Sequence, residues 1–451
     1  MIIAPSPPQI KGLLSRGLWK SAIGRQLLIA IVAIISHRGR MSAQQVASAV
    51  VGDSRHRASV GRFLKRHGEG LSWIGFQCAQ RLLALDGWRR RCVFILDSTS
   101  VSHQGEHTPN TFSTGNRQRR PVRGRRYNQY QRARRGCHLF VWGLLITPDG
   151  RRSPSFRCYY TRQYCEQRGL RHYTQADLGA QLVRELAIPS CGPVVVLADT
   201  AFESRQVRAA CQQRGFDWIM PANPERVVGG VKPRPQLWSL TKRFSHRMFT
   251  PIRLSPDQGG YVAMRRLSAS SRGSKKTRTF YVHEERCAVQ SIGEVRIVFS
   301  TKAKPQPGGL LDRKQTKILL SNDLQLSVAE IVELYLLRWQ IELFFKELKS
   351  SLGMHQYRFR DFDRIRAWME VYRITFHYLE WVRAKEMHAS SGRERTWWSG
   401  QRTHGLCLAV CERLDEALLL SLQRQTSTQA GLRKLRKLLR KALPTEHRNA
   451  A

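Results

Sequence analysis

The sequence lacks the features that define several large protein classes. Its ten cysteines include no Cys-x-x-Cys pair and show no zinc-like spacing, so we expect reduced, packed thiols in a cytosolic protein. The first apolar run, Leu27 to Ile35, is too short to cross a bilayer and suits a core helix. The first residues are rich in proline and carry no secretory signal. The sequence therefore predicts a soluble protein.

Acidic residues are scarce. There are 33 Asp and Glu against 76 Lys and Arg, and the formal charge is +43. Such an excess opposes compaction unless a polyanion neutralises it. Nucleic acid is the expected partner, because Lys and Arg that bind phosphates release condensed counterions; composition leaves an acidic membrane surface open as the alternative. With 451 residues, 41% of them apolar, and 11 Trp, the chain can form a substantial core in two or three domains.

Hydrophobic periodicity divides the chain into regions. Residues from about 10 to 90 read as helical, and 42–65 resemble two short helices joined by a turn. This pair is either a DNA-binding helix-turn-helix or part of a small helical domain with a basic face. From about 92 to 222 the predicted order is β, β, β, α, β, α, β, which implies a mixed sheet with helices on its faces. Short strands follow over 223–320, then helices over about 327–352 and 361–385.

Two basic segments stand outside this pattern. Residues 115–135 contain nine Arg, too polar for a core, and predict a loop. We expect Arg123, Arg125 and Arg126 in this loop to contact the DNA backbone, and a solvated flexible loop is the alternative. The Leu-Arg-Lys repeat that starts at Leu432 predicts a basic amphipathic helix that binds DNA, a partner or a membrane surface, with DNA preferred.

The segment around residue 340 combines one carboxylate with several cations. Wound as a helix, it places five polar side chains within an arc of about 80° beside an apolar stripe. These are Tyr335, Arg338, Glu342, Lys346 and Lys349. Such a helix can hold a metal ion and a polyanion at its margin, and an ordinary amphipathic helix with a solvated side is the alternative. Ser327, with Glu330 three residues later, predicts a capping box at its start.

Two more carboxylates follow predicted buried strands. Asp97 and Asp199 each come directly after a run of apolar residues. Either one alone would more often be a turn former or a helix cap. With Glu342 they form a set of three hard oxygen donors, which suits Mg²⁺ or Mn²⁺. Two such ions about 4 Å apart can activate a water or a 3′-hydroxyl in phosphodiester displacement.

This arrangement resembles the RNase H-like core of DDE transposases. The spacing Tyr335-(2)-Arg338-(3)-Glu342-(6)-Lys349 is similar to the Y-R-E-K signature of the insertion-sequence-four superfamily. The segments that start at Asp97 and Asp199 resemble the motifs around that group's first two Asp. The resemblance covers roughly residues 90–385. It implies an α/β fold with an RNase H-like mixed sheet core, an inserted β-rich subdomain, a helical N-terminal domain and a helical C-terminal region.

The resemblance also implies roles and boundaries. Asp97, Asp199 and Glu342 would be catalytic and hold two Mg²⁺ or Mn²⁺ ions, while Tyr335, Arg338, Lys346 and Lys349 would grip the end of the DNA. The expected parts are a DNA-binding domain (1–90), the first part of the core (91–222), the inserted subdomain (223–322), the second part of the core (323–385) and a basic C-terminal region (386–451).

The predicted function is that of a DNA transposase. It would bind the terminal inverted repeats of its element, cleave the ends and join their 3′-hydroxyls to target DNA. It would act as a homodimer on paired double-stranded ends, in the cytoplasm with the nucleoid and without a membrane. Two alternatives stay open: an RNase H-like nuclease or resolvase, which would hydrolyse without joining, and a catalytically silent DNA-binding regulator.

Overall fold

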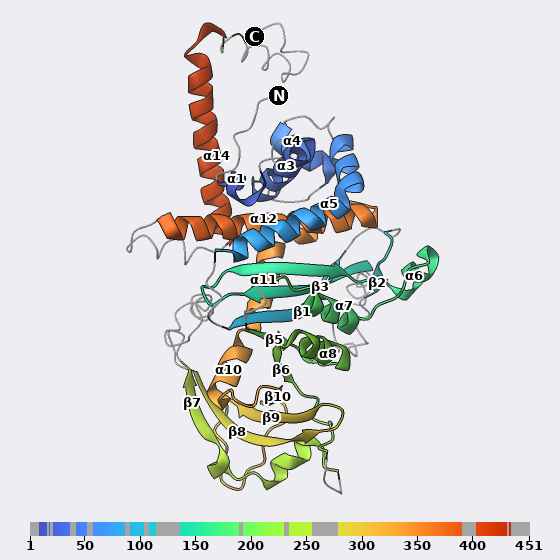
Figure 1. The fold of residues 1–451 in the computed structure, drawn as a ribbon, viewed down its shortest axis with the longest axis vertical. Helices are drawn as coiled ribbons and strands as arrows, with labels where there is room; N and C mark the ends of the chain where they lie inside the picture. Colours follow the sequence, from blue (N-terminus) through green and yellow to red (C-terminus); the bar gives the residue numbers. More distant parts are fainter. Residues whose placement is uncertain are drawn as a thin grey trace, which may run out of the picture. The chain divides into compact units, whose positions relative to one another are not determined.

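The structure of the chain is a computed structural model (Figure 1). It describes residues 9–15, 18, 21–36, 42–51, 57–85, 91–102, 108–113, 136–188, 193–229, 234–254, 278–389, 403–430 and 433. The chain forms two compact units. The first comprises Met1–Leu85, Val101–His138 and Phe345–Ala451, and the second comprises Asp86–Ser100 and Leu139–Phe344. Arg123, Arg125, Arg126 and the basic segment that starts at Leu432 lie outside the described residues, apart from Arg433.

The described strands form one mixed sheet. Its order is β2-β3-β1-β5-β6-β10-β9-β8-β7, and β4 pairs with β3 outside this path (Figure 1). The strands are β1 (Cys92–Ser102), β2 (Phe112–Ser113), β3 (Gly136–Ile146), β4 (Arg152–Cys158), β5 (Val194–Ala198), β6 (Asp217–Pro221), β7 (Thr250–Leu254), β8 (Arg278–Val289), β9 (Gly293–Thr301) and β10 (Thr316–Ser321). The predicted mixed α/β class is confirmed.

Strand direction changes along the sheet. β1, β5 and β6 are parallel, as expected of strands joined by helical crossovers. β3 and β4 form an antiparallel hairpin. β10 then pairs antiparallel with β6, and β9, β8 and β7 follow it. The strands predicted over 223–320 thus continue the same sheet beyond β6.

β1 is longer than its apolar run. The sequence predicts that the strand ends at Leu96, but it continues to Ser102. All five residues up to Leu96 are buried, and beyond Asp97 burial alternates, with Thr99 and Val101 buried. The second half therefore has the period of two that is typical of a strand with one covered face. Asp97 lies within β1, at the point where its pairing with β5 ends.

Helices of the second unit connect these strands. α6 (Arg162–Arg168), which the sequence pattern did not predict, starts at an N-cap of Thr161 and ends at Gly169, whose φ of 62° suits glycine. α7 (Gln175–Arg184) begins with a capping box of Thr174 and Asp177 and packs against α8 (Arg205–Arg214).

The segment predicted as one long helix from Ser327 is broken. The capping box of Ser327 and Glu330 is confirmed and starts α10 (Val328–Leu336). The backbone N–H groups of Leu337 and Arg338 then donate to carbonyls three residues earlier, which tightens the turn. α11 (Trp339–Lys346) follows, and it leads into a π-helical turn, η7 (Glu347–Ser351). The single-helix prediction was therefore wrong at this turn.

The first unit is mostly helical. α5 (Arg57–Leu83) has a kink at His67 and packs against α12 (Phe362–Ala389), the helix predicted over 361–385 (Figure 1). The other helices are α1 (Ile10–Leu13), α3 (Ala22–Ser36), α4 (Ala43–Val51) and α14 (Thr403–Thr426). Among the described residues of both units, no helix is long and apolar enough to cross a membrane.

Candidate catalytic site

Strand register brings the two predicted aspartates side by side. In the parallel pair β1–β5, Leu96 is the partner of Ala198, and these are the last paired residues. Asp97 and Asp199 come next on their strands. Neighbouring strands lie about 4.8 Å apart, so the two carboxylates start from adjacent backbone positions.

Backbone amides hold one oxygen of each aspartate. The Ser98 N–H donates to Asp97 Oδ1 at 2.7 Å, and the Ala201 N–H donates to Asp199 Oδ1 at 2.9 Å. Asp199 thereby caps the 3₁₀ turn η4 (Thr200–Phe202), so its alternative interpretation as a cap is also observed. A carboxylate held through one oxygen keeps the other available for a cation.

The turn after Asp199 is firmly packed. The buried Phe202 lies against Gly179 of α7, where an added Cβ would come within 2.8 Å of the Phe202 ring. Glu203 forms ion pairs with Arg208 and Arg226, and its side chain is only 3% exposed. These contacts fix the backbone that carries Asp199.

Arg338 links Glu342 to Asp97. Its Nη2 donates to Glu342 Oε1 at 2.7 Å, and its Nη1 lies 3.7 Å from Asp97 Oδ2. Burial opposes the charge of Arg338, but the hydrogen bond to Glu342 and the nearby anions raise the pKa of Arg338 overall. Arg338 itself lies in the tight turn between α10 and α11.

The three carboxylates, Asp97, Asp199 and Glu342, form what we call the carboxylate cluster. Burial raises the pKa of Asp97 to about 6, against the effect of the Ser98 amide, and the charge of Asp199 adds to the rise. Arg338 lowers this pKa and Glu342 raises it again. The Arg338 guanidinium thus contacts two of the three acids, and the charges of Asp199 and Glu342 both disfavour the ionised form of Asp97.

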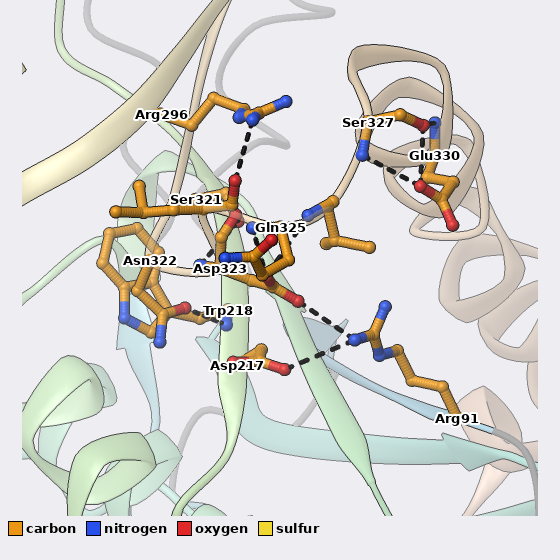
Figure 2. A network of polar contacts seen from close by, with 12 residues as sticks. Arg91, Asp217, Trp218, Arg296, Ser321, Asn322, Asp323, Gln325, Ser327 and Glu330 are labelled. Atoms are coloured by element: carbon orange, nitrogen blue, oxygen red, sulfur yellow. Dashed lines mark hydrogen bonds and ion pairs between the residues drawn. The ribbon is translucent and has the colours of Figure 1, made fainter. Parts of the chain in front are cut away.

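A polar network fixes the connection between β10 and α10 (Figure 2). Arg91, directly before β1, donates to Asp323 Oδ2 at 3.0 Å and lies 3.8 Å from Asp217 of β6. The backbone N–H of Trp218 donates to Asn322 Oδ1 at 2.6 Å. The start of the helix pair that carries Arg338 and Glu342 is thus tied to the strands that carry or flank the aspartates.

Tyr335 and Lys317 complete the surroundings. Tyr335 is 8% exposed, its hydroxyl accepts a hydrogen bond from Arg338, and burial raises its pKa to about 12. Lys317 of β10 places its Nζ 5.0 Å from the centre of the Tyr335 ring. Sequence reasoning missed Lys317. The available signal was a lysine directly before the apolar run Ile318–Leu320 of a β-rich segment.

Two further predicted DNA contacts belong to the other unit. Lys346 ends α11 and Lys349 lies in η7, both in the first unit, whereas the carboxylate cluster belongs entirely to the second. Burial lowers the pKa of Lys349, and the nearby Cys137 opposes this effect. Of the predicted site residues, the second unit contains Asp97, Asp199, Glu342, Tyr335 and Arg338.

The residue types of the carboxylate cluster suit a divalent cation, but their side chains are not arranged around one. Its oxygen donors are those that Mg²⁺ and Mn²⁺ prefer, and their mutual repulsion is what a cation would relieve. Among the described residues, however, no three His, Cys, Asp or Glu side chains are grouped so that they could hold a metal ion. The Arg338 guanidinium instead contacts two of the three acids.

Comparison with known families finds a match over part of the chain. Residues 174–375 match the family model described as Transposase DDE domain. The predicted resemblance to a DDE transposase is thereby supported over a segment that includes Asp199, Tyr335, Arg338, Glu342 and Lys349. Asp97 precedes the segment that is similar to the transposase domain, and the register of β1 with β5 links it to that segment. The chain has no match among curated proteins.

Proposed function

We propose that this protein is a DNA transposase whose carboxylate cluster cleaves DNA at the ends of its element and joins the 3′-hydroxyls to target DNA. The observation that carries the proposal is the β1–β5 register. This register puts Asp97 and Asp199 on neighbouring strands, and Arg338 connects Asp97 to Glu342 of α11. Asp199, Arg338 and Glu342 lie within residues 174–375, which are similar to a transposase DDE domain.

Asp97, Asp199 and Glu342 would hold Mg²⁺ or Mn²⁺. When bound, such ions activate the attacking oxygen and stabilise the leaving one. The backbone bonds from Ser98 and Ala201 keep the two aspartates oriented, so little rearrangement is needed on the strand side. Arg338 pairs with Glu342 and Asp97 in the free protein, and we propose that it also contacts a phosphate next to the scissile bond.

The proposal extends to the rest of the chain. We infer an RNase H-like core in residues 91–222 and 323–385, which the β3–β4 hairpin and the parallel β1–β5–β6 strands support. The narrower Y-R-E-K superfamily, the DNA-binding role of residues 1–90 and a homodimer on paired ends belong to the same proposal. So do DNA contacts by Lys346, Lys349 and the Arg-rich segment with Arg123, Arg125 and Arg126.

The test uses the purified full-length protein, Mg²⁺ and duplexes taken from the DNA that flanks its own gene. We expect cleavage at one junction and joining of its 3′-hydroxyl to a second duplex. Glu342→Gln should abolish both steps and retain binding, whereas Glu294→Gln, at an exposed position on β9, should leave both intact. Joining by Glu342→Gln at the wild-type rate would contradict the proposal, and hydrolysis without joining would favour a nuclease or resolvase.

A further inference from the structure

Lys317 lies beside the carboxylate cluster without belonging to the predicted signature. It is on β10, between β6 and β9 in the sheet, and its register partner on β9 is Ser300. Its side chain is exposed, and its amine lies over the ring of the largely buried Tyr335 at 5.0 Å. The ring thus fixes the direction of an ammonium group that solvent can still reach.

Its electrostatic surroundings are mixed. Asp199 and Glu342 attract the ammonium, while Arg338 and Lys302 repel it. Although Lys317 is exposed, nearby protein atoms partly desolvate its amine, and this desolvation together with the two cations lowers the pKa of Lys317 overall. The surroundings therefore disfavour the charged form of Lys317. Attraction by Asp199 and Glu342 does not outweigh this effect, so these two acids alone do not explain why a lysine occupies this position.

Arg338 provides the contrast. Its guanidinium is engaged by Glu342 and Asp97 in the free protein. Within the described part of the chain, no carboxylate forms an ion pair with the Lys317 amine. Of these two cations next to the carboxylates, Lys317 is the one with donors to spare for an incoming anion.

We propose that Lys317 binds a DNA phosphate adjacent to the carboxylate cluster, with the Tyr335 ring as the platform that orients its ammonium group. The inference rests on the proposed function and specifies how DNA enters that site. A phosphate supplies a direct ion-pair partner, which neither Asp199 nor Glu342 is, and its binding releases a condensed counterion. The contact holds the backbone of the DNA without reading its sequence.

The test measures DNA affinity over a series of salt concentrations for Lys317→Gln and Lys317→Arg, by fluorescence anisotropy in EDTA with a duplex from the DNA that flanks the gene. Lys314→Gln is the matched control, because Lys314 is an exposed lysine just before β10. We expect Lys317→Gln to weaken binding about tenfold and to reduce the slope of log K against log salt by about 0.9. Lys317→Arg and Lys314→Gln should keep the wild-type slope.

Several outcomes would overturn the inference. An unchanged slope for Lys317→Gln, with circular dichroism showing a folded protein, removes the phosphate contact. Loss of cleavage with a wild-type slope would mean that Lys317 acts only through Asp199 and Glu342. If Glu342→Gln still loses joining and keeps binding in either case, the proposed function stands and only the role of Lys317 fails. Failure of the wild-type protein to bind the duplex removes both.

Discussion

Two clusters in different parts of the chain each contain an Arg–Glu ion pair within one helical turn, but the surroundings of the two pairs differ. In the carboxylate cluster, Arg338 donates to Glu342, one helical turn away, at 2.7 Å. In α12 of the first unit, Arg373 donates to Glu370, three residues away, also at 2.7 Å. Spacing and bond length alone do not separate a structural ion pair from a functional one.

The partners of each pair separate them. We call Ser72, Glu370 and Arg373 the helix-pair cluster. The Ser72 hydroxyl donates to the second Glu370 oxygen at 2.7 Å, and Arg373 Nη2 donates to the Ser72 carbonyl at 2.9 Å. Glu370 and Arg373 are 6% and 8% exposed, and one acid meets one base. In the carboxylate cluster one guanidinium contacts two of three acids, so negative charge is in excess.

We expect the largest difference between the two clusters for a substitution of Asp97. Asp97→Asn removes one charge from the unbalanced cluster, so we expect the rate of DNA cleavage in Mg²⁺ to fall roughly 10³-fold, about 4 kcal/mol in activation free energy. Folding should not suffer, because repulsion with Asp199 and Glu342 is relieved. Single-turnover cleavage and urea unfolding measure the two effects. A variant that unfolds more easily than wild type would show that the cluster is structural.

The opposite result is expected in the helix-pair cluster. Arg373→Ala leaves Glu370 buried without its base, so the free energy of unfolding should fall by about 4 kcal/mol. Arg366→Ala on the same helix is the control, since Arg366 lies 3.9 Å from Asp363 and both are well exposed. It should cost less than about 1 kcal/mol. Urea unfolding of both variants checks this, and equal losses would contradict the distinction.

Part of the carboxylate cluster could be predicted from the sequence. The apolar runs before Asp97 and Asp199 predicted two buried strands, each followed by an acid, and the spacing around Glu342 predicted Arg338 as its neighbour. The break at Leu337 and the position of Lys317 were not predictable, because no Gly or Pro marks the first and the second depends on contact with Tyr335. Arg373 and Ser72 are separated by 301 residues, so local periodicity cannot pair them.

The acid balance also predicts a pH dependence. The pKa of Asp97 in the folded protein, about 6, exceeds its ordinary value of 3.8. The folded state therefore binds its proton more tightly, and the stability that the protonated form contributes is lost as pH rises through 6. In EDTA, the unfolding free energy of Asp97→Asn relative to wild type should rise by about 2 kcal/mol between about pH 4.5 and about pH 7.

Two comparisons sharpen this result. Asp312→Asn, at a loop position, serves as the control and should show no such rise relative to wild type. Mg²⁺ should stabilise wild type more at the higher pH, because the ion binds the deprotonated acid. A flat difference between Asp97→Asn and wild type across this range would mean that burial and the neighbouring acids do not raise the pKa of Asp97.

The smallest change separates the two roles of Tyr335. Tyr335→Phe removes the hydroxyl that accepts from Arg338 and keeps the ring under Lys317. Since Arg338 retains Glu342 and Asp97, stability should fall by only about 1 kcal/mol, and the salt slope of DNA binding should stay at the wild-type value. Tyr335→Leu should instead reproduce part of the Lys317→Gln loss, because it removes the ring. Equal salt slopes for the two Tyr335 variants would show that the ring does not orient the lysine.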